Sequence, residues 1–310
     1  MAKVRSTFRG AFCALALLVC STAFTSSAEA QGVLRFVSGT GNDANNCLRP
    51  TPCRSINRGV ESAPDGAEVI ILDTAGYGPT VTINKSITIT APSGVAATIA
   101  TPSGDSITIT SGNVVLRGLS LVGQGTGTNG INLQGGTSVS VENFTINGFS
   151  RAGINAVGGA QLFVKDTTIR NGGLDGIFVA NGSATIDNCR LEGNAPTGSP
   201  IGFGVFASNG SRVTVRDSVA AGNGSGFVAE AEAGSSVQLN VENSVAANNS
   251  VDGFRVAGAG TPIIRVSNSA ATNNANGFRQ QAGVFESRGN NTVRGNTTNT
   301  VGIITSITGT

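Results

Sequence analysis

The sequence predicts an all-β solenoid of about ten stacked coils. Three copies of one pattern stand close together: SVAAGNGSGFVA (218–229), SVAANNSVDGFRV (244–256) and SAATNNANGFRQ (269–280). Each copy has an Asn-rich turn, then Gly followed by a large apolar residue. This Gly recurs every 22 to 28 residues, at Gly130, Gly153, Gly176, Gly204, Gly226, Gly253, Gly277 and Gly302. A short period of this kind with β-branched segments is the signature of a solenoid.

Within each coil, apolar and polar residues alternate, as they do in a β-strand with one buried face. Helical periodicity is absent, and 44 glycines in 310 residues would weaken helices. Two sets of strands therefore place apolar pairs inward. One set is Val139/Val141, Leu162/Val164, Ala184/Ile186, Val213/Val215, Leu239/Val241 and Ile264/Val266; the other is Ile131/Leu133, Ile154/Ala156, Ile177/Val179, Phe227/Ala229 and Phe254/Val256.

An Asn or Asp marks one corner of each coil. Both residue types tolerate left-handed backbone, and their side chains can bond from coil to coil. The pattern favours a structural corner over the alternative, a row of metal ligands or catalytic groups. The aligned residues are Asn143, Asp166, Asn188, Asp217, Asn243, Asn268 and Asn290.

The position just before this corner alternates in charge. Strands stack about 4.8 Å apart, so each acid would have a basic neighbour in the next coil. We interpret this row as a device that sets the register between coils; the alternative is a hidden catalytic acid–base pair. Its members are Arg117, Glu142, Lys165, Asp187, Arg216 and Glu242.

The first 30 residues have the pattern of an export signal. Lys3, Arg5 and Arg9 precede a short apolar core (11–20), and AEA (28–30) supplies a small-x-small cleavage pattern. This signal holds three of the 20 basic and one of the 18 acidic residues, so the mature chain has 17 of each. A net charge of zero gives no footprint for nucleic acid, and no apolar run is long enough to span a membrane. We expect a periplasmic or extracellular protein whose oligomeric state the sequence leaves open.

Cysteine usage fits an oxidising compartment. Cys47 and Cys53 stand close together in a Pro-bearing loop, and export favours their pairing as a disulfide over two unpaired thiols. Cys189 takes the inward place that Thr167 and Ser218 hold in other coils. It is therefore predicted to be a small buried residue rather than a reactive thiol.

The N-G-[IF] and N-[ST] repeats, together with RFVSGTGNDANNCLRPTPCRSINRGVESAPDGAEVIIL (35–72), resemble the pectin-lyase-like superfamily of right-handed parallel β-helix proteins. The resemblance implies a leading segment and cap over 31–72, with a short helix near Ser55–Ala63 that covers the first coil. The β-helix would follow over 73–310. Function is less determined, because the superfamily holds lyases, hydrolases, esterases, adhesins and inert scaffolds.

The chemistry of this superfamily finds little support in the residues. The chain has no His, so it lacks the Asp and His set of the family's polygalacturonate hydrolases and any His-based metal site. The lyases use carboxylate-bound Ca²⁺, but Asp175 and Asp252 lie three coils apart, about 14 Å, too far to share one ion. We therefore predict no catalytic residues, no metal and no cofactor.

A binding face is predicted where the residue after the large apolar one points outward. Two Phe side chains on adjacent coils would be exposed there, beside the long turn 194–203. Aromatic rings with flanking amides and guanidinium groups suit a sugar chain; the alternative is that the turn buries both rings. The candidate residues are Asn132, Asn155, Phe178, Phe206, Arg255 and Arg279, with Val228 completing the row.

The resulting hypothesis is an exported, non-catalytic β-helix scaffold that binds a polysaccharide or a cell-envelope glycan. The alternative is a polysaccharide lyase or glycoside hydrolase with a diverged active site.

Overall fold

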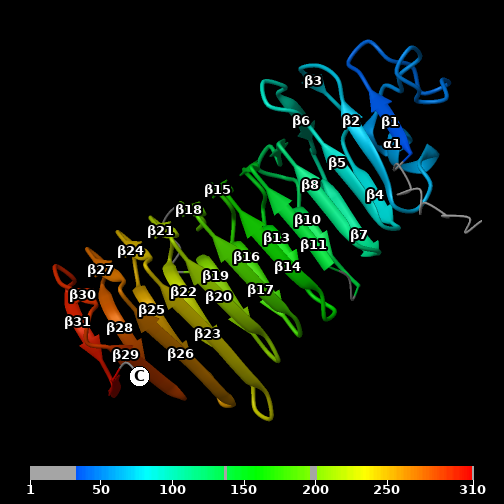
Figure 1. Cartoon of the computed structure of the whole chain (residues 1–310). Helices are drawn as coiled ribbons and strands as arrows, with labels where there is room; N and C mark the ends of the chain where they lie inside the picture. The colour runs from blue at the N-terminus through cyan, green and yellow to red at the C-terminus, as the bar shows by residue number, and fades with distance from the viewer. Residues whose placement is uncertain (1–32, 136–137, 196–200, 309–310) are drawn as a thin grey trace, which may run out of the picture. The chain divides into compact units, whose positions relative to one another are not determined.

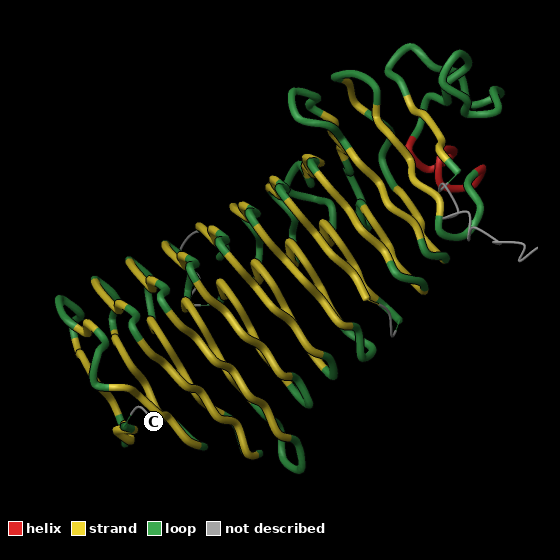
Figure 2. Tube along the Cα trace, viewed as in Figure 1, coloured by secondary structure: helices red, strands yellow, loops and turns green. Residues whose placement is uncertain are grey.

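The structure is a right-handed parallel β-helix of about ten coils, as predicted. A computed structural model describes residues 33–135, 138–195 and 201–308, and the predicted export signal lies outside these ranges. Within them, three parallel sheets account for nearly all regular structure (Figures 1 and 2). A typical coil gives one strand to each sheet, so neighbours in a sheet are three strands apart in the chain.

Sheet 1 has twelve strands and sheets 2 and 3 have ten each among the described residues. Sheet 1 contains β1 (Leu34–Val37), β2 (Ala67–Ile71), β5 (Ile87–Thr90), β8 (Val114–Arg117), β11 (Ser138–Glu142), β14 (Gln161–Lys165), β17 (Ser183–Asp187), β20 (Arg212–Arg216), β23 (Ser236–Glu242), β26 (Thr261–Ser267), β29 (Val284–Arg288) and β32 (Ile304–Ile307). Sheet 2 contains β4 (Val81–Asn84), β7 (Ile107–Ser111), β10 (Asn129–Leu133), β13 (Ala152–Ala156), β16 (Asp175–Ala180), β19 (Phe203–Ser208), β22 (Ser225–Glu230), β25 (Asp252–Ala257), β28 (Asn276–Gln280) and β31 (Thr298–Val301). Sheet 3 contains β3 (Ala75–Gly76), β6 (Ala97–Ala100), β9 (Leu119–Val122), β12 (Thr145–Asn147), β15 (Thr168–Arg170), β18 (Arg190–Glu192), β21 (Val219–Ala221), β24 (Val245–Ala247), β27 (Ala270–Thr272) and β30 (Thr292–Val293).

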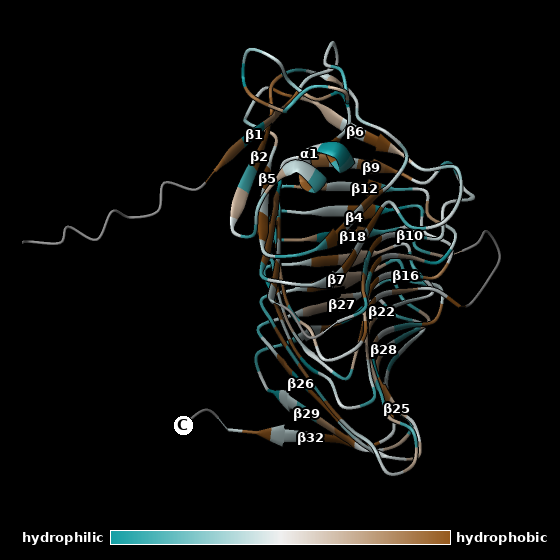
Figure 3. Ribbon diagram, turned by 90° about the vertical axis from the view of Figure 1, so that its right-hand side faces the viewer, coloured by the Kyte–Doolittle hydropathy of each residue, from teal (hydrophilic) through white to brown (hydrophobic). Residues whose placement is uncertain are grey.

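The core is one continuous apolar column inside the coils. Every residue of the two predicted inward sets is buried. Phe227, Phe254 and Phe278 stack on successive coils with ring centroids 5.2 and 5.3 Å apart. The strands of sheet 2 follow one another along this column in the order β4, β7, β10, β13, β16, β19, β22, β25 and β28, and Figure 3 shows brown, hydrophobic segments among the strands. Stacking buries each coil's apolar face, which no coil could bury alone.

The predicted corner lies between sheets 1 and 3. Six of its seven residues have left-handed φ angles between 46° and 56°: Asn143, Asp166, Asn188, Asp217, Asn243 and Asn268. Their side chains bond from coil to coil, with Asn188 Nδ2 donating to Asp166 Oδ1 at 2.7 Å and Asn268 Nδ2 to Asn243 Oδ1 at 3.2 Å. Asn290 is the exception, because it lacks positive φ and instead accepts from the Asn268 backbone N–H.

A second Asn row lies inside the corner between sheets 3 and 2, and sequence reasoning missed it. Asn194, Asn223, Asn249 and Asn274 are all buried. The side-chain oxygens of Asn223, Asn249 and Asn274 each accept a hydrogen bond from the backbone N–H of the Asn one coil earlier. Asn249 Nδ2, for example, also donates to the Ala220 carbonyl at 3.1 Å. This row satisfies turn backbone that the buried corner would otherwise leave unbonded.

A helix covers the first coil. α1 (Ile56–Ser62) begins after Ser55, whose hydroxyl caps the Arg58 N–H, and buries Ile56, Gly59 and Val60. This agrees with the predicted helix near 55–63. Lys85 Nζ donates to the carbonyls of Val60 and Ala63 and so satisfies the end of the helix.

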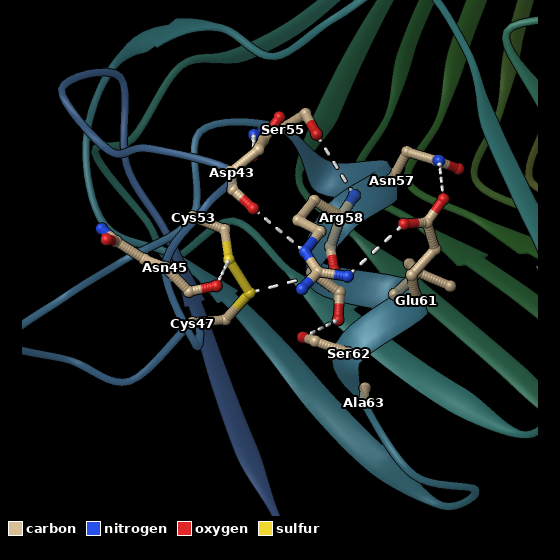
Figure 4. Close-up of polar contacts among 12 residues, drawn as sticks. Asp43, Asn45, Cys47, Cys53, Ser55, Asn57, Arg58, Glu61, Ser62 and Ala63 are labelled. Carbon is tan, nitrogen blue, oxygen red and sulfur yellow. Dashed lines mark hydrogen bonds and ion pairs between the residues drawn. A yellow bond between two sulfur atoms is a disulfide. The ribbon is translucent and has the colours of Figure 1, made fainter.

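The predicted disulfide joins Cys47 and Cys53 beside this helix (Figure 4). Their Cα atoms are 4.7 Å apart, and both side chains are buried. Asp43 ties the loop to α1, because its Oδ1 accepts from the Ser55 N–H at 2.8 Å and its carbonyl from Arg58 Nε at 3.1 Å. Among the described residues, no helix has the length and apolar character needed to cross a membrane.

The alternating charge row lies on the outer face of sheet 1. Strand register places Arg117, Glu142, Lys165, Asp187, Arg216 and Glu242 side by side in that order. Arg117–Glu142 and Arg216–Asp187 form ion pairs of 2.9 Å. Burial acts to raise the pKa of Glu142, but hydrogen bonds from Arg117 and Ser140 outweigh it and lower that pKa. The alternation of charge is therefore present in the structure, and two of the five neighbouring pairs form ion pairs; its role in setting the register remains a prediction.

Reversing one charge in this row should cost stability at low salt. Asp187→Lys would place three cations in succession with Lys165 and Arg216. Because the pairs are exposed, we expect the melting temperature to fall by only about 1–3 °C in low-salt buffer. At 1 M salt the difference should disappear, since screening removes the repulsion. Equal melting temperatures at low salt would contradict the role of the row.

Candidate functional site

The predicted binding row lies on the outer face of sheet 2. Strand register places its seven members in one continuous line: Asn132, Asn155, Phe178, Phe206, Val228, Arg255 and Arg279. The structure corrects their expected exposure. Asn132, Asn155 and Val228 are buried, and the two Phe and two Arg side chains are half-buried rather than exposed.

A second outward row runs beside the first. The repeat Gly faces the core, where a Cβ at Gly130 would lie 2.6 Å from the Ile146 side chain. Both the Gly and the residue after it therefore face the core. This interrupts the two-residue alternation, so the residue before the Gly faces outward. This position holds Asn129, Ala152, Asp175, Phe203, Ser225, Asp252 and Asn276 in register. Under strict two-residue alternation these residues have no expected binding role, and only Asp175 and Asp252 were considered, as ligands of one metal ion. Their constant position directly before the repeat Gly was the signal that could have found them.

An aromatic cluster occupies the middle of the face. The Phe178 and Phe206 rings meet edge to face with centroids 5.4 Å apart, and Phe203 packs on Phe206 at 4.8 Å. Phe203 lies at the end of the long turn 194–203. Residues 196–200 of this turn lie outside the described residues, so the predicted covering of the rings by the turn is untested. What the turn does contribute is a third ring.

Arg255 borders this cluster. Its guanidinium carbon lies 5.5 Å from the centre of the Phe203 ring, a cation–π arrangement, and its Nη2 donates to Glu230 at 2.7 Å. Its Nε is buried and has no partner among the described residues. One coil farther on, Arg279 lies 3.5 Å from the fully buried Asp252, which also accepts from Asn276 at 2.9 Å.

The other end of the face is organised by Asp105, which precedes β7. Its Oδ1 accepts from Asn129 Nδ2 at 2.7 Å, and its Oδ2 accepts from Asn132 Nδ2 at 2.6 Å. Asn155 Nδ2 in turn donates to Asn132 Oδ1 at 2.8 Å. This chain of side chains leaves Asn129 Oδ1 and Asn155 Oδ1 buried without a donor. An unpaired buried polar atom costs about 1–3 kcal/mol, so such atoms are rarely retained without a use.

Asp175 is the third acceptor without a partner. It is 7% exposed, and its Oδ1 is buried and receives no hydrogen bond. Burial raises its pKa to about 7, although the nearby Arg151 charge acts in the opposite direction. Such a carboxyl exchanges its proton near neutral pH, a property that groups in functional sites often share.

In the described ranges, no group of three or more His, Cys, Asp or Glu side chains is placed so that it could hold a metal ion. Asp175 and Asp252 lie on β16 and β25 with β19 and β22 between them, as predicted. Cys189 is buried away from this face, as expected, and burial raises its thiol pKa to about 11, which disfavours the reactive thiolate.

The raised pKa of Asp175 predicts a pH-dependent stability. The folded chain holds this proton up to about pH 7, whereas the unfolded chain releases it near its ordinary value of 3.8. The contribution of this proton to the free energy of unfolding is therefore fully present below about pH 4. It is lost as the pH rises through 7, and the loss is at most about 4 kcal/mol. Asp175→Asn should remove this slope in urea unfolding between pH 4 and 8.5.

The matched control for that measurement is Glu61→Gln, which changes a carboxyl on α1 with 56% of its side chain exposed. It should keep the slope of the unaltered chain. Parallel curves for Asp175→Asn and the unaltered chain would show that Asp175 is not the group responsible.

Comparison with known proteins supports the fold. The structure is similar to pectate lyase Pel9A, with a TM-score of 0.70 and 17% identity over 89% of this chain and 78% of that one. It is also similar to an alginate lyase from Paenibacillus sp. str. FPU-7, with a TM-score of 0.61 and 16% identity over 87% and 99% of the two chains. A third similar structure is XylC in complex with xylose, with a TM-score of 0.54 and 9% identity over 84% and 70%. No curated protein matches the sequence of this chain.

A family profile described as "Right handed beta helix region" matches residues 69–199 and 129–298. These two overlapping matches include every strand of the face from β7 to β28. They span well over half of the 310 residues, in agreement with the parallel three-sheet architecture. The chain therefore belongs to the right-handed β-helix family.

Proposed function

We propose that this protein is an exported, non-catalytic β-helix scaffold that binds a polysaccharide or cell-envelope glycan on the outer face of sheet 2. The observation that carries the proposal is the cluster of Phe178, Phe203 and Phe206 between two groups of buried polar side chains. The ligand-contacting residues proposed from the sequence are Asn132, Asn155, Phe178, Phe206, Arg255 and Arg279.

The chemistry of the face suits a sugar chain. Sugar rings present C–H faces that pack on aromatic rings and hydroxyl groups that need hydrogen-bond partners. The three half-buried Phe rings supply the first, and the half-buried side chains of Arg255 and Arg279 supply donors for the second. A row repeated every 4.8 Å or so along the coils also suits an extended polymer rather than a compact ligand.

The similar structures support the same class of ligand. Two of them are named as lyases of pectate and alginate, and the third is a complex with xylose. Export is supported by the signal pattern of residues 1–30 and by the Cys47–Cys53 disulfide, which forms in oxidising compartments.

A second candidate function is a polysaccharide lyase or glycoside hydrolase, and one observation favours it. Asp175, with a pKa of about 7, could transfer protons near neutral pH. The other acids of this face are already bonded: Glu230 to Arg255 at 2.7 Å, Asp252 to Asn276 at 2.9 Å, and Asp105 to Asn129 and Asn132 at 2.7 and 2.6 Å. No second free carboxyl accompanies Asp175 in the described part of this face. The binding function is therefore favoured.

The aromatic cluster gives the first test. Replacing Phe178 and Phe206 by Ser should weaken binding to a glycan array by at least tenfold per folded molecule, because ring stacking is lost. Phe163→Ser is the matched control, since this Phe is 37% exposed on sheet 1. A double variant that melts several degrees lower but binds unchanged would show that the rings serve only as packing.

The enzymatic alternative is tested by incubating the protein with pectate, alginate and xylan. We expect no unsaturated products by ultraviolet absorbance and no new reducing ends. Turnover that Asp175→Asn abolishes would replace the binding function by catalysis at this residue.

A further inference from the structure

Six successive strands of sheet 1, from β8 to β23, present an accessible outer face. The residues that point outward from these strands form three rows in register, and each of them is partly or fully exposed. The first row is the alternating charge row. The second is Val115, Ser140, Phe163, Thr185, Thr214 and Asn240, and the third is Ser138, Gln161, Ser183, Arg212 and Gln238.

The alternating charge row is only partly neutralised within one chain. Its ion pairs join the first member to the second and the fourth to the fifth, Arg117 to Glu142 and Asp187 to Arg216. Lys165 and Glu242, the third and sixth members, are exposed and have no ion-pair partner in the described part of the chain. One cation and one anion of this row are therefore available to an outside partner.

A row of six alternating charges is complementary to itself when its order is reversed. From β8 to β23 the signs run plus, minus, plus, minus, plus, minus. A second copy that lies face to face on sheet 1, with its coil axis reversed, would present the opposite sign at every position. The two-fold axis of this arrangement runs parallel to the strands and passes between β14 and β17.

This arrangement gives the two unpaired charges a partner. Lys165 lies opposite Asp187 of the second copy, and Glu242 lies opposite Arg117 of the second copy. The remaining contact joins Glu142 to Arg216 of the second copy. Each contact occurs twice because of the two-fold symmetry, so all twelve charges of the two rows face a charge of opposite sign.

Other face-to-face arrangements of the same two rows are repulsive. Parallel coil axes would set each charge opposite its own copy. A displacement of one strand in the reversed arrangement would also place cations on cations and anions on anions. Like charges brought together on a surface disfavour the wrong register, so the row selects one alignment.

The second outward row fits the same alignment. Phe163, which is 37% exposed, lies on β14 beside the two-fold axis and falls opposite Thr185 of the second copy. Ser140 falls opposite Thr214, and Val115 opposite Asn240. An exposed aromatic ring at the centre of the face would therefore pack on a small side chain that carries a methyl group.

We infer that the outer face of sheet 1 is a docking surface for a second copy of this chain, which forms a symmetric dimer with reversed coil axes. Six strands of about five residues cover about 29 by 17 Å, a small area for a protein interface. The dimer is therefore weak, with a dissociation constant in the micromolar range or above. It leaves the outer face of sheet 2 free, so it goes beyond the proposed glycan-binding function and is independent of it.

The experiment measures the mass of the mature chain, residues 31–310, by sedimentation velocity from about 5 to 500 µM in low-salt buffer. We expect the average mass to rise toward twice the monomer mass with concentration. In 1 M salt the chain should be monomeric, because screening removes the attraction between the two rows. A monomer at every concentration in low salt would overturn the inference.

Two charge reversals then test the alignment. Lys165→Glu and Asp187→Lys each set like charges at both central contacts, so either variant alone should dimerise at least tenfold more weakly. An equimolar mixture of the two variants restores opposite charges at both contacts and should dimerise within about threefold of the unaltered chain. Arg170→Glu, on sheet 3, and Glu61→Lys, on α1, are the matched controls, since both residues are exposed and lie off this face.

The remaining outcomes separate the parts of the inference. A dimer that neither reversal weakens would show that the copies meet on another face. Single variants that are monomeric, with a mixture that stays monomeric, would overturn the reversed alignment. Glycan arrays are read below micromolar protein, where this dimer is dissociated, so Phe163→Ser remains a valid control for the aromatic cluster of sheet 2.

Discussion

The structure depends on one constraint: each coil hydrogen-bonds in parallel register to the coils on either side. Because the spacing is about 4.8 Å, the nearest neighbour of any side chain is the equivalent residue one repeat away. Every position therefore becomes a row. A row must either pack on itself, as Phe227, Phe254 and Phe278 do, or satisfy itself by hydrogen bonds and charge alternation.

Most polar rows in this protein meet that requirement. The corner row passes amide bonds from coil to coil, the inner Asn row bonds both backbone and side chains, and the charged row of sheet 1 alternates in sign. Against this background the outer face of sheet 2 stands apart. Five of its polar residues on β10, β13, β16, β22 and β25 keep a buried atom without a partner: Asn129, Asn155, Asp175, Ser225 and Arg255.

The concentration of unsatisfied atoms on one face is the reason why we propose that the function lies there. A structural row would have been completed by the simplest available side chain, as Ser218, Ser244 and Ser269 complete the row that contains Cys189. On sheet 2 the repeat is instead broken by three Phe residues and by acids that hold the two Arg side chains. Departure from the repeat, and not the repeat itself, marks the candidate site.

The sequence by itself determined the β-helix, its inward rows, the left-handed corner, the charge row, the cap and the disulfide. These features are local or periodic, and a fixed period tells which residues stack. Only the tertiary structure decided that Phe203 and Asp175 face outward, because the backbone turns inward twice at the repeat Gly and breaks the alternation. It also decided the partners of Arg255 and Arg279, since Glu230 and Asp252 reach them from adjacent coils, about 25 residues away in the chain. Such ion pairs depend on how far a side chain extends across the face, and the period of the sequence does not give that information.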